Sequence, residues 1–156
     1  MDTTTRNMLH LVDMGSLERV SIQYVPRNIK MRKSADLARL KVIGRNEPVI
    51  HITGGRKELS LDLDFHCVQE DRQDVIRKVR WLESLASSDG FENPQPLVKL
   101  IWGDLYRHNL WKVEFVDATF ELFDADYQML PKQAYVKIVL IPITPKNRTH
   151  DDIKRY

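Results

Sequence analysis

The chain has 156 residues and a formal net charge of +2; 42% of its residues are hydrophobic and 29% are charged. This length and balance are typical of one folded domain with its own core, and they exclude a fibrous repeat and a wholly disordered chain. The small net charge also argues against a general nucleic-acid binder.

The first residues lack a charged segment followed by a long apolar run, which is the pattern of a secretory signal. The longest apolar stretch, near YVKIVLIPI, is far shorter than the roughly 18 residues that cross a membrane as a helix. We therefore expect synthesis in a cytoplasm and no membrane span. Residues 1–16, which precede the first predicted strand, are interpreted as an N-terminal arm. The single cysteine, Cys67, lies in an apolar alternation, which indicates a reduced core thiol.

The segment LERVSIQYV places Val20, Ile22 and Tyr24 on one face. This period of two predicts a half-buried strand, which Pro26 ends. Residues 27–45 then carry seven basic residues and one acid. Charge runs are usually solvated, so this basic region, extending over 27–47, is either a solvated loop or an extended arm or hairpin that docks on a neighbouring subunit or ring.

The segment PVIHITGGRKELSLDLDFHCV contains two apolar runs, and the glycines of TGGR between them predict a tight hairpin turn. In the second run the apolar residues at 59, 61, 63, 65 and 67 face one way, while Ser60, Asp62, Asp64 and His66 face the other. No apolar wall, nucleophile or oxyanion donor accompanies the two acids. They are therefore expected to be solvated or subunit-facing rather than a catalytic pair.

The segment EDRQDVIRKVRWLESLASSDG changes to a helical period, because Val75, Val79, Leu82 and Ala86 recur at helical spacing. The acids at 70, 71 and 74 suit the N-terminal end of the helix dipole, and SSDG ends the helix. Trp81 lies at the margin of the apolar stripe, so we expect it to be half exposed and available to a partner. The docking hypothesis therefore names eight residues: Arg27, Lys30, Arg32, Lys33, Arg39, Lys41, Arg45 and Trp81.

Three further strands are predicted over 97–102, 110–116 and 133–141, joined by the turns WGDLYRHN and DADYQMLP. About six strands with one helix predict an α+β fold in which a mostly antiparallel sheet forms a sandwich or partial barrel. We interpret residues 1–156 as a single domain with a C-terminal tail at 143–156.

None of the patterns that carry chemistry is complete. No pair of the five histidines has a metal-ligand spacing, and one cysteine cannot supply a zinc site. Asp124 and Asp126 could begin a calcium loop, but the glycine and the glutamate that such a loop needs are missing, so a turn between two strands is predicted instead. The sequence therefore predicts no enzyme, no metal and no cofactor.

The order of segments resembles the tail-tube-like baseplate and hub proteins of contractile injection systems. The resemblance covers about residues 17–142 and rests on IQYVP, VIGRNEP, TGGRKELSLDLDF, RWLESL, PLVKLIWGD and LFDADYQMLPKQAYVKIVL, in that order. Two positions depart from the usual F-D-x-D-G-x-P-x-R-A pattern: Tyr127 stands where glycine is common, and Lys132 and Gln133 stand near the usual arginine. Many relatives continue into a LysM peptidoglycan-binding module, which the remaining TPKNRTHDDIKRY does not supply.

This resemblance implies a tube fold whose copies close a ring, usually six-fold, between the central hub with its spike and the tail tube. It implies a virion protein of the tail baseplate, such as a tube initiator, that contacts tube and hub proteins and lines the channel through which DNA is ejected. Either Ser60, Asp62 and Asp64, or the face that carries Lys112 and Glu114, would line that channel.

Two other interpretations remain open. The chain could be a peptidoglycan-associated hub protein of the same particle, although neither a LysM module nor a catalytic acid pair is present. It could also be a small cytoplasmic nucleic-acid-binding β-domain, which the basic region favours, although no aromatic residues are interleaved with the bases there.

Overall fold

The computed structural model describes residues 8–22, 29–40, 43–44, 49–67, 71–88, 94–106 and 109–143. Within them the chain forms strands, one α-helix and a short 3-10 helix. In chain order these elements are β1 (Leu9–Asp13), β2 (Arg19–Ile22), β3 (Ile29–Leu40), β4 (Val49–His66), α1 (Asp74–Leu85), β5 (Val98–Ile101), β6 (Leu110–Asp124), η2 (Ala125–Tyr127) and β7 (Leu130–Ile143).

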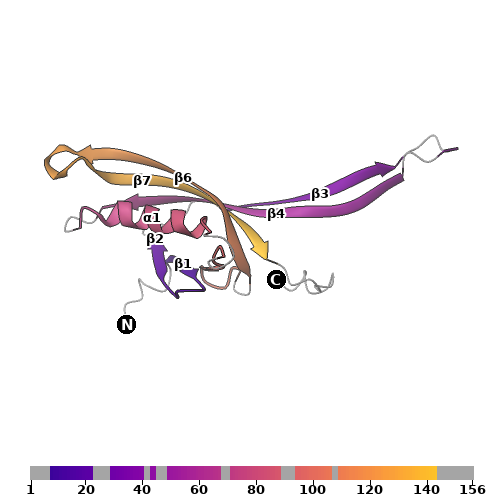
Figure 1. Ribbon diagram of the computed structural model, residues 1–156, viewed down its shortest axis with the longest axis horizontal. Helices are drawn as coiled ribbons and strands as arrows, with labels where there is room; N and C mark the ends of the chain where they lie inside the picture. The colour runs from indigo at the N-terminus through magenta and orange to yellow at the C-terminus, as the bar shows by residue number, and fades with distance from the viewer. Residues whose placement is uncertain are drawn as a thin grey trace.

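All neighbouring strands pair antiparallel in one seven-stranded sheet with the order β2-β1-β5-β6-β7-β4-β3. No described residue joins β2 to β3, so the sheet is open at both ends. The structure thus confirms the predicted α+β fold with a mostly antiparallel sheet and one helix. The long strands β4, β6 and β7 form one layer, and α1 with β1 and β2 lies on one side of it (Figure 1).

The core fills the space between the long strands and the elements that cover them. Leu59, Leu61, Leu63 and Phe65 of β4 are buried there, as the alternation predicts, while Cys67 is half-buried at the core margin. The other core residues come from β1, β2, α1, β5, β6 and β7: Leu9, Leu11, Val20, Ile22, Val75, Val79, Leu82, Leu85, Val98, Leu100, Trp111, Val113, Ala134, Val136, Ile138 and Leu140.

Two strands lie outside the strands predicted above, although a hairpin was one interpretation of the basic region. Residues 9–13, assigned above to an N-terminal arm, form β1 between β2 and β5. The basic region contains β3, which pairs with β4 from Ile29↔Leu61 to Leu40↔Val49 and makes a long hairpin. The pairing of β4 with β7 ends at Leu59↔Leu140, and past this pair β3 and β4 continue as a two-stranded ribbon in the described residues. We call this ribbon, residues 32–40 and 49–58, the arm.

The predicted TGGR hairpin turn is wrong, because β4 runs through these glycines as one strand. Asp36 pairs with Gly54 and Leu37 with Ile52, so the register shifts by one residue and the glycines lie beside a β-bulge. A Cβ on Gly55 would lie 2.6 Å from the carbonyl oxygen of Ser34. The glycine therefore allows β3 to approach β4 closely instead of turning the chain.

The helix α1 occupies the predicted segment and buries Val75, Val79 and Leu82. It ends at Leu85, and Ala86, predicted to lie in the buried stripe, is its exposed C-cap residue. At the other end, Asp71 Oδ1 accepts a hydrogen bond at 3.1 Å from the backbone N–H of Gln73, the N-cap residue, so the acid fixes the turn ahead of the helix instead of capping an amide within it.

The pairing of Asp71 makes a pH-dependent contribution to stability. Arg77 Nη1 donates to Asp71 Oδ2 at 2.9 Å, and this bond holds the pKa of Asp71 below its usual value of 3.8. A carboxyl whose folded pKa is depressed stabilises the fold above its unfolded pKa, and this contribution is lost as the pH falls through the folded pKa. Unfolding by urea at about pH 5 and about pH 3 should therefore show a smaller acid-induced loss in Asp71→Asn than in the wild type. Arg77→Met should behave like Asp71→Asn, and an unchanged loss in both variants would contradict the assignment.

Gln95 fastens the C-terminal end of α1 to β6. Its side-chain amide donates to the carbonyl oxygen of Leu85, at 3.1 Å, and to that of Val113. Gln95→Ala should lower the free energy of unfolding by about 1–3 kcal/mol, because two partly buried carbonyl groups lose their donor. Urea unfolding measures the loss, with the exposed Ser88→Ala as the control; equal stability of the two variants would show that the bonds contribute nothing.

Candidate assembly surfaces

The face of the long strands that points away from the core carries both sets of predicted channel residues. Ser60, Asp62 and Asp64 pair with Val139, Lys137 and Tyr135 of β7. These β7 residues pair in turn with Phe115, Asp117 and Thr119 of β6. Residues in register on neighbouring strands share a face, so this row of side chains forms one surface, which we call the outer face.

The other predicted set lies on the same surface. Lys112 pairs with Ile141, which lies two residues from Val139 and so has the same orientation. Glu114 lies at the register shift of β6 and contacts Arg56, which is four residues from Ser60 on β4. The two sets that the sequence offered as alternatives therefore belong to one face.

Charges on the outer face are unevenly distributed along the strands. Near the β6–β7 connection it carries Asp62, Asp64, Asp117 and Glu121 with Lys137 among them. His66 Nε2 lies 3.2 Å from Asp64 Oδ1, and the side-chain amide of Gln133 donates to the same oxygen at 3.3 Å. This end of the face is acidic, whereas its other end leads to the basic arm.

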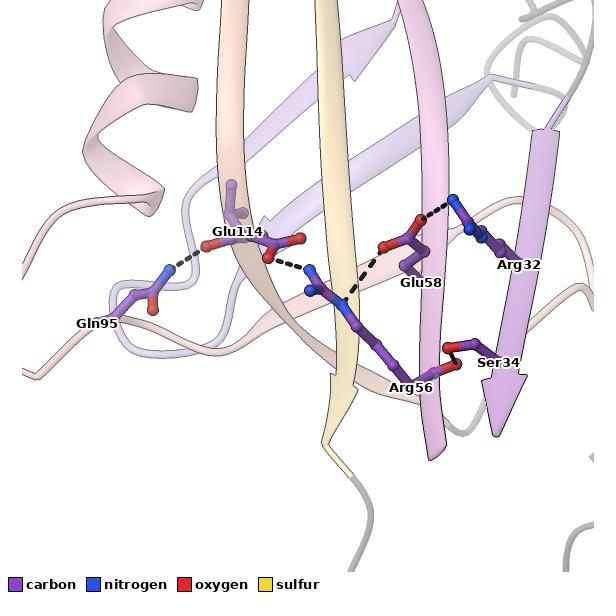
Figure 2. A network of polar contacts seen from close by, with 7 residues as sticks. Arg32, Ser34, Arg56, Glu58, Gln95 and Glu114 are labelled. Atoms are coloured by element: carbon purple, nitrogen blue, oxygen red, sulfur yellow. Dashed lines mark hydrogen bonds and ion pairs between the residues drawn. The ribbon is translucent and has the colours of Figure 1, made fainter. Parts of the chain in front are cut away.

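A chain of ion pairs crosses the sheet at the root of the arm (Figure 2). Arg56 Nη2 contacts Glu114 Oε1, and Arg56 Nε lies 3.4 Å from Glu58 Oε2. Glu58 Oε1 in turn lies 4.0 Å from Arg32 Nη1. The hydrogen bond and charge of Glu114 raise the pKa of Arg56. Each pair is solvated and individually weak, but together they link β3 and β4 to β6 across β7.

The connection between β6 and β7 is the predicted turn, and it is fastened to the body. Asp124 Oδ1 accepts from the backbone N–H of Asp126 at 3.2 Å, so the acid bonds its own turn as expected. Asp124 Oδ2 also lies 3.3 Å from Arg72 Nη1 and 3.3 Å from Lys132 Nζ. The guanidinium of Arg72 stacks 4.6 Å above the Tyr127 ring. These contacts fix residues 121–130, which we call the tip, to the segment that precedes α1.

The predicted docking residues fall into three groups. Lys30, Arg32, Lys33 and Arg39 are exposed on β3, while Arg27, Lys41 and Arg45 lie outside the described residues. Trp81 is half-buried against the core, as predicted for the stripe margin, and its Nε1 donates to Glu18 Oε2 at 3.1 Å. None of these positions tests the docking role itself.

Long strand edges remain open in the described part of the sheet. β3 has a partner on one side only, and β6 pairs with β5 only through Val98↔Trp111 and Lys99↔Leu110. From Lys112 to Asp124, β6 therefore has one edge without a described strand beside it. The sequence did not reveal this feature, because it depends on how far each strand outruns its neighbour.

Within the ranges that the structure describes, no three His, Cys, Asp or Glu side chains gather as a metal site. The same residues include no helix with the length and hydropathy of a membrane span.

A scan of the chain against protein-family models finds no match, and neither does a search of curated proteins. Among solved structures it is similar to a chain from the tail of an empty gene transfer agent particle refined helically with C6 symmetry, with 12% identity over 96% of this chain and 99% of that chain and a TM-score of 0.44. It is also similar to a chain from the virion of a native gene transfer agent particle, with 11% identity, coverage of 93% and 95%, and a TM-score of 0.41. Sequence identities and TM-scores as low as these do not assign the chain to a family.

Proposed function

We propose that this protein is a structural component of a phage-type contractile tail, and that its copies close a ring which connects the baseplate hub to the tail tube. The observation that carries the proposal is the pair of long open edges, on β3 and on β6 from Lys112 onward. Open edges favour pairing with another chain, and in a closed ring the part of β3 beside the long strands can pair with β6 of the next copy. The sequence resemblance to tube-like baseplate proteins supports the same role.

The direction of the strands indicates which edges meet. β6, β7, β4 and β3 alternate in direction, so β3 runs opposite to β6. Copies related by rotation about a channel would place β3 of one copy beside β6 of the next and continue the antiparallel pattern. The edge strand β2 runs parallel to β3, so a seam between those two strands would break the pattern. We therefore propose a seam between β3 and β6.

In such a ring the outer face would line the channel, because α1, β1 and β2 occupy the opposite side of the long strands (Figure 1). Asp62, which is exposed, and the acids around it would repel the phosphates of DNA and keep it from binding to the wall. The role we propose for these residues is thus passive: Ser60, Asp62, Asp64, Lys112 and Glu114 shape a passage and catalyse nothing.

Native mass spectrometry and negative-stain imaging of the purified protein test this function. We expect closed rings with a central opening, and six copies is the number that the resemblance implies. A protein that stays monomeric at high concentration, with and without its hub and tube neighbours, would contradict the proposal.

A nucleic-acid-binding function has one observation in its favour, the exposed bases Lys30, Arg32, Lys33 and Arg39 on β3. Their removal would then weaken binding to duplex DNA, and the affinity of the wild type would fall steeply with salt concentration. We expect no such steep dependence, because the acidic end of the outer face opposes binding. A filter-binding titration over a range of salt concentrations decides between the two functions.

A further inference from the structure

The tip exposes large apolar side chains in an unfavourable backbone conformation. Leu122, Phe123, Tyr127 and Met129 have exposed fractions of 64%, 54%, 50% and 60%. Leu122 and Met129 have φ angles of 56° and 58°, in the left-handed region that bulky residues rarely adopt. Backbone strain of this kind, together with exposed apolar area, is typical of a surface that serves a contact.

The charge of the tip is opposite to that of the arm. Residues 121–130 contain three acids, Glu121, Asp124 and Asp126, and no lysine or arginine. The arm contains five bases and two acids, and its bases are Arg32, Lys33, Arg39, Arg56 and Lys57. Four of these bases, Arg32, Lys33, Arg39 and Arg56, are exposed, and so is the apolar Leu37 of the arm, with an exposed fraction of 56%.

The two surfaces lie at opposite ends of the long axis of the molecule (Figure 1). If the long strands follow the channel, the copies of one ring carry all their arms at one level and all their tips at the other. An arm cannot reach a tip within its own ring. Shifting a second ring along the channel brings the arms of one ring to the tips of the next.

We propose that the tip is the docking site for the arm of a second copy in an adjacent ring. This inference rests on the proposed ring. The apolar tip residues would cover Leu37, while Glu121 and Asp126 would face the arm bases. The protein would then build a tube several rings long rather than one adaptor ring, because each ring offers arms at one end and tips at the other.

The double variant Leu122→Asn, Met129→Asn tests the tip without threatening the fold. Asparagine adopts positive φ more readily than leucine or methionine, so the monomer should be as stable as the wild type or more stable. Rings should still form, whereas the fraction of stacked rings in electron micrographs should fall by about ten-fold or more, since every copy in a ring loses its contact at once. The control is Arg80→Glu on the exposed face of α1.

A charge exchange identifies the partner of the tip. Lys33→Glu with Arg39→Glu on the arm should abolish stacking, and so should Glu121→Lys with Asp126→Lys on the tip. A chain that carries all four substitutions should stack again, because the charges are complementary once more. Stacking that survives the asparagine variant, or that the exchange does not restore, would overturn the inference. The absence of rings in every variant, wild type included, would instead overturn the proposed function.

Discussion

A mixture of two variants, one with a blocked β3 edge and one with a blocked β6 edge, is expected to form a dimer that cannot grow. Proline removes an amide donor and blocks pairing at an edge. Successive N–H groups of a strand point alternately to its two neighbours. Of two adjacent residues on an edge strand, one therefore points its N–H to the open side, and proline at that residue leaves the pairing within the sheet intact. Lys30→Pro and Met31→Pro cover both possibilities on β3, and Ala118→Pro and Thr119→Pro cover them on β6. Circular dichroism selects the folded member of each pair.

Each selected variant alone should be monomeric, because a head-to-tail ring needs both edges. Their equimolar mixture should give a dimer of one β3-blocked chain and one β6-blocked chain, joined through the two intact edges. Native mass spectrometry distinguishes the two chains by mass. The matched control, Ser88→Ala on an exposed residue after α1, should form the complete ring.

The same mixture discriminates against a two-fold symmetric contact. If β3 paired with β3, the β6-blocked variant would dimerise without its partner. If β6 paired with β6, the β3-blocked variant would do so. Either homodimer, or a mixture that remains monomeric, would contradict the seam between β3 and β6.

The elements with one buried face could be predicted from the sequence, because burial imposes a period on the chain. The alternation at 59–67 marks part of β4, and the helical stripe marks α1. The alternation does not mark β3, for which a hairpin was one of two interpretations, because no described core residue lies in the arm and residues such as Lys33 and Asp36 occupy both of its faces. The TGGR turn was misread for a related reason: a glycine that admits a neighbouring strand looks, in sequence, like a glycine that turns the chain.

The candidate surfaces were less accessible to sequence reasoning than the fold. The outer face required the register of three strands, which alone shows that Asp62 and Lys112 share a side. The contact between Arg56 and Glu114 joins residues 58 positions apart and leaves no local pattern. The turn at Asp124 was predicted from its chemistry, but its bond to Arg72 depends on the packing of the tip beside α1.

The largest loss of stability is expected from Trp111→Ala. Trp111 is fully buried, and its ring meets that of Tyr106 edge-on, with centroids 5.6 Å apart. It pairs with Val98 on one side and Pro142 on the other, at the short junction that joins β5 to the long strands. Truncation leaves a cavity at this junction and should lower the free energy of unfolding by about 3–5 kcal/mol. In a domain of this size, the melting temperature should fall by about 10 °C.

Trp111→Phe separates the loss of volume from the loss of the indole N–H. No described residue accepts a hydrogen bond from Trp111 Nε1, so phenylalanine removes a polar atom that gains nothing in the core. It should therefore cost less than about 1.5 kcal/mol. Equal losses in the two variants would show that the N–H has a partner and that cavity volume is not the main effect.

The position of Trp111 also predicts where the alanine variant opens first. Because β5 meets β6 only at residues 98–99 and 110–111, loosening this junction should release β1, β2 and β5 before the pairing of β4, β6 and β7 is lost. Hydrogen exchange should accelerate in the three short strands of Trp111→Ala while the long strands stay protected. Since the proposed seam uses only β3 and β6, this variant should still form rings at low temperature, which separates the stability of the covering layer from assembly.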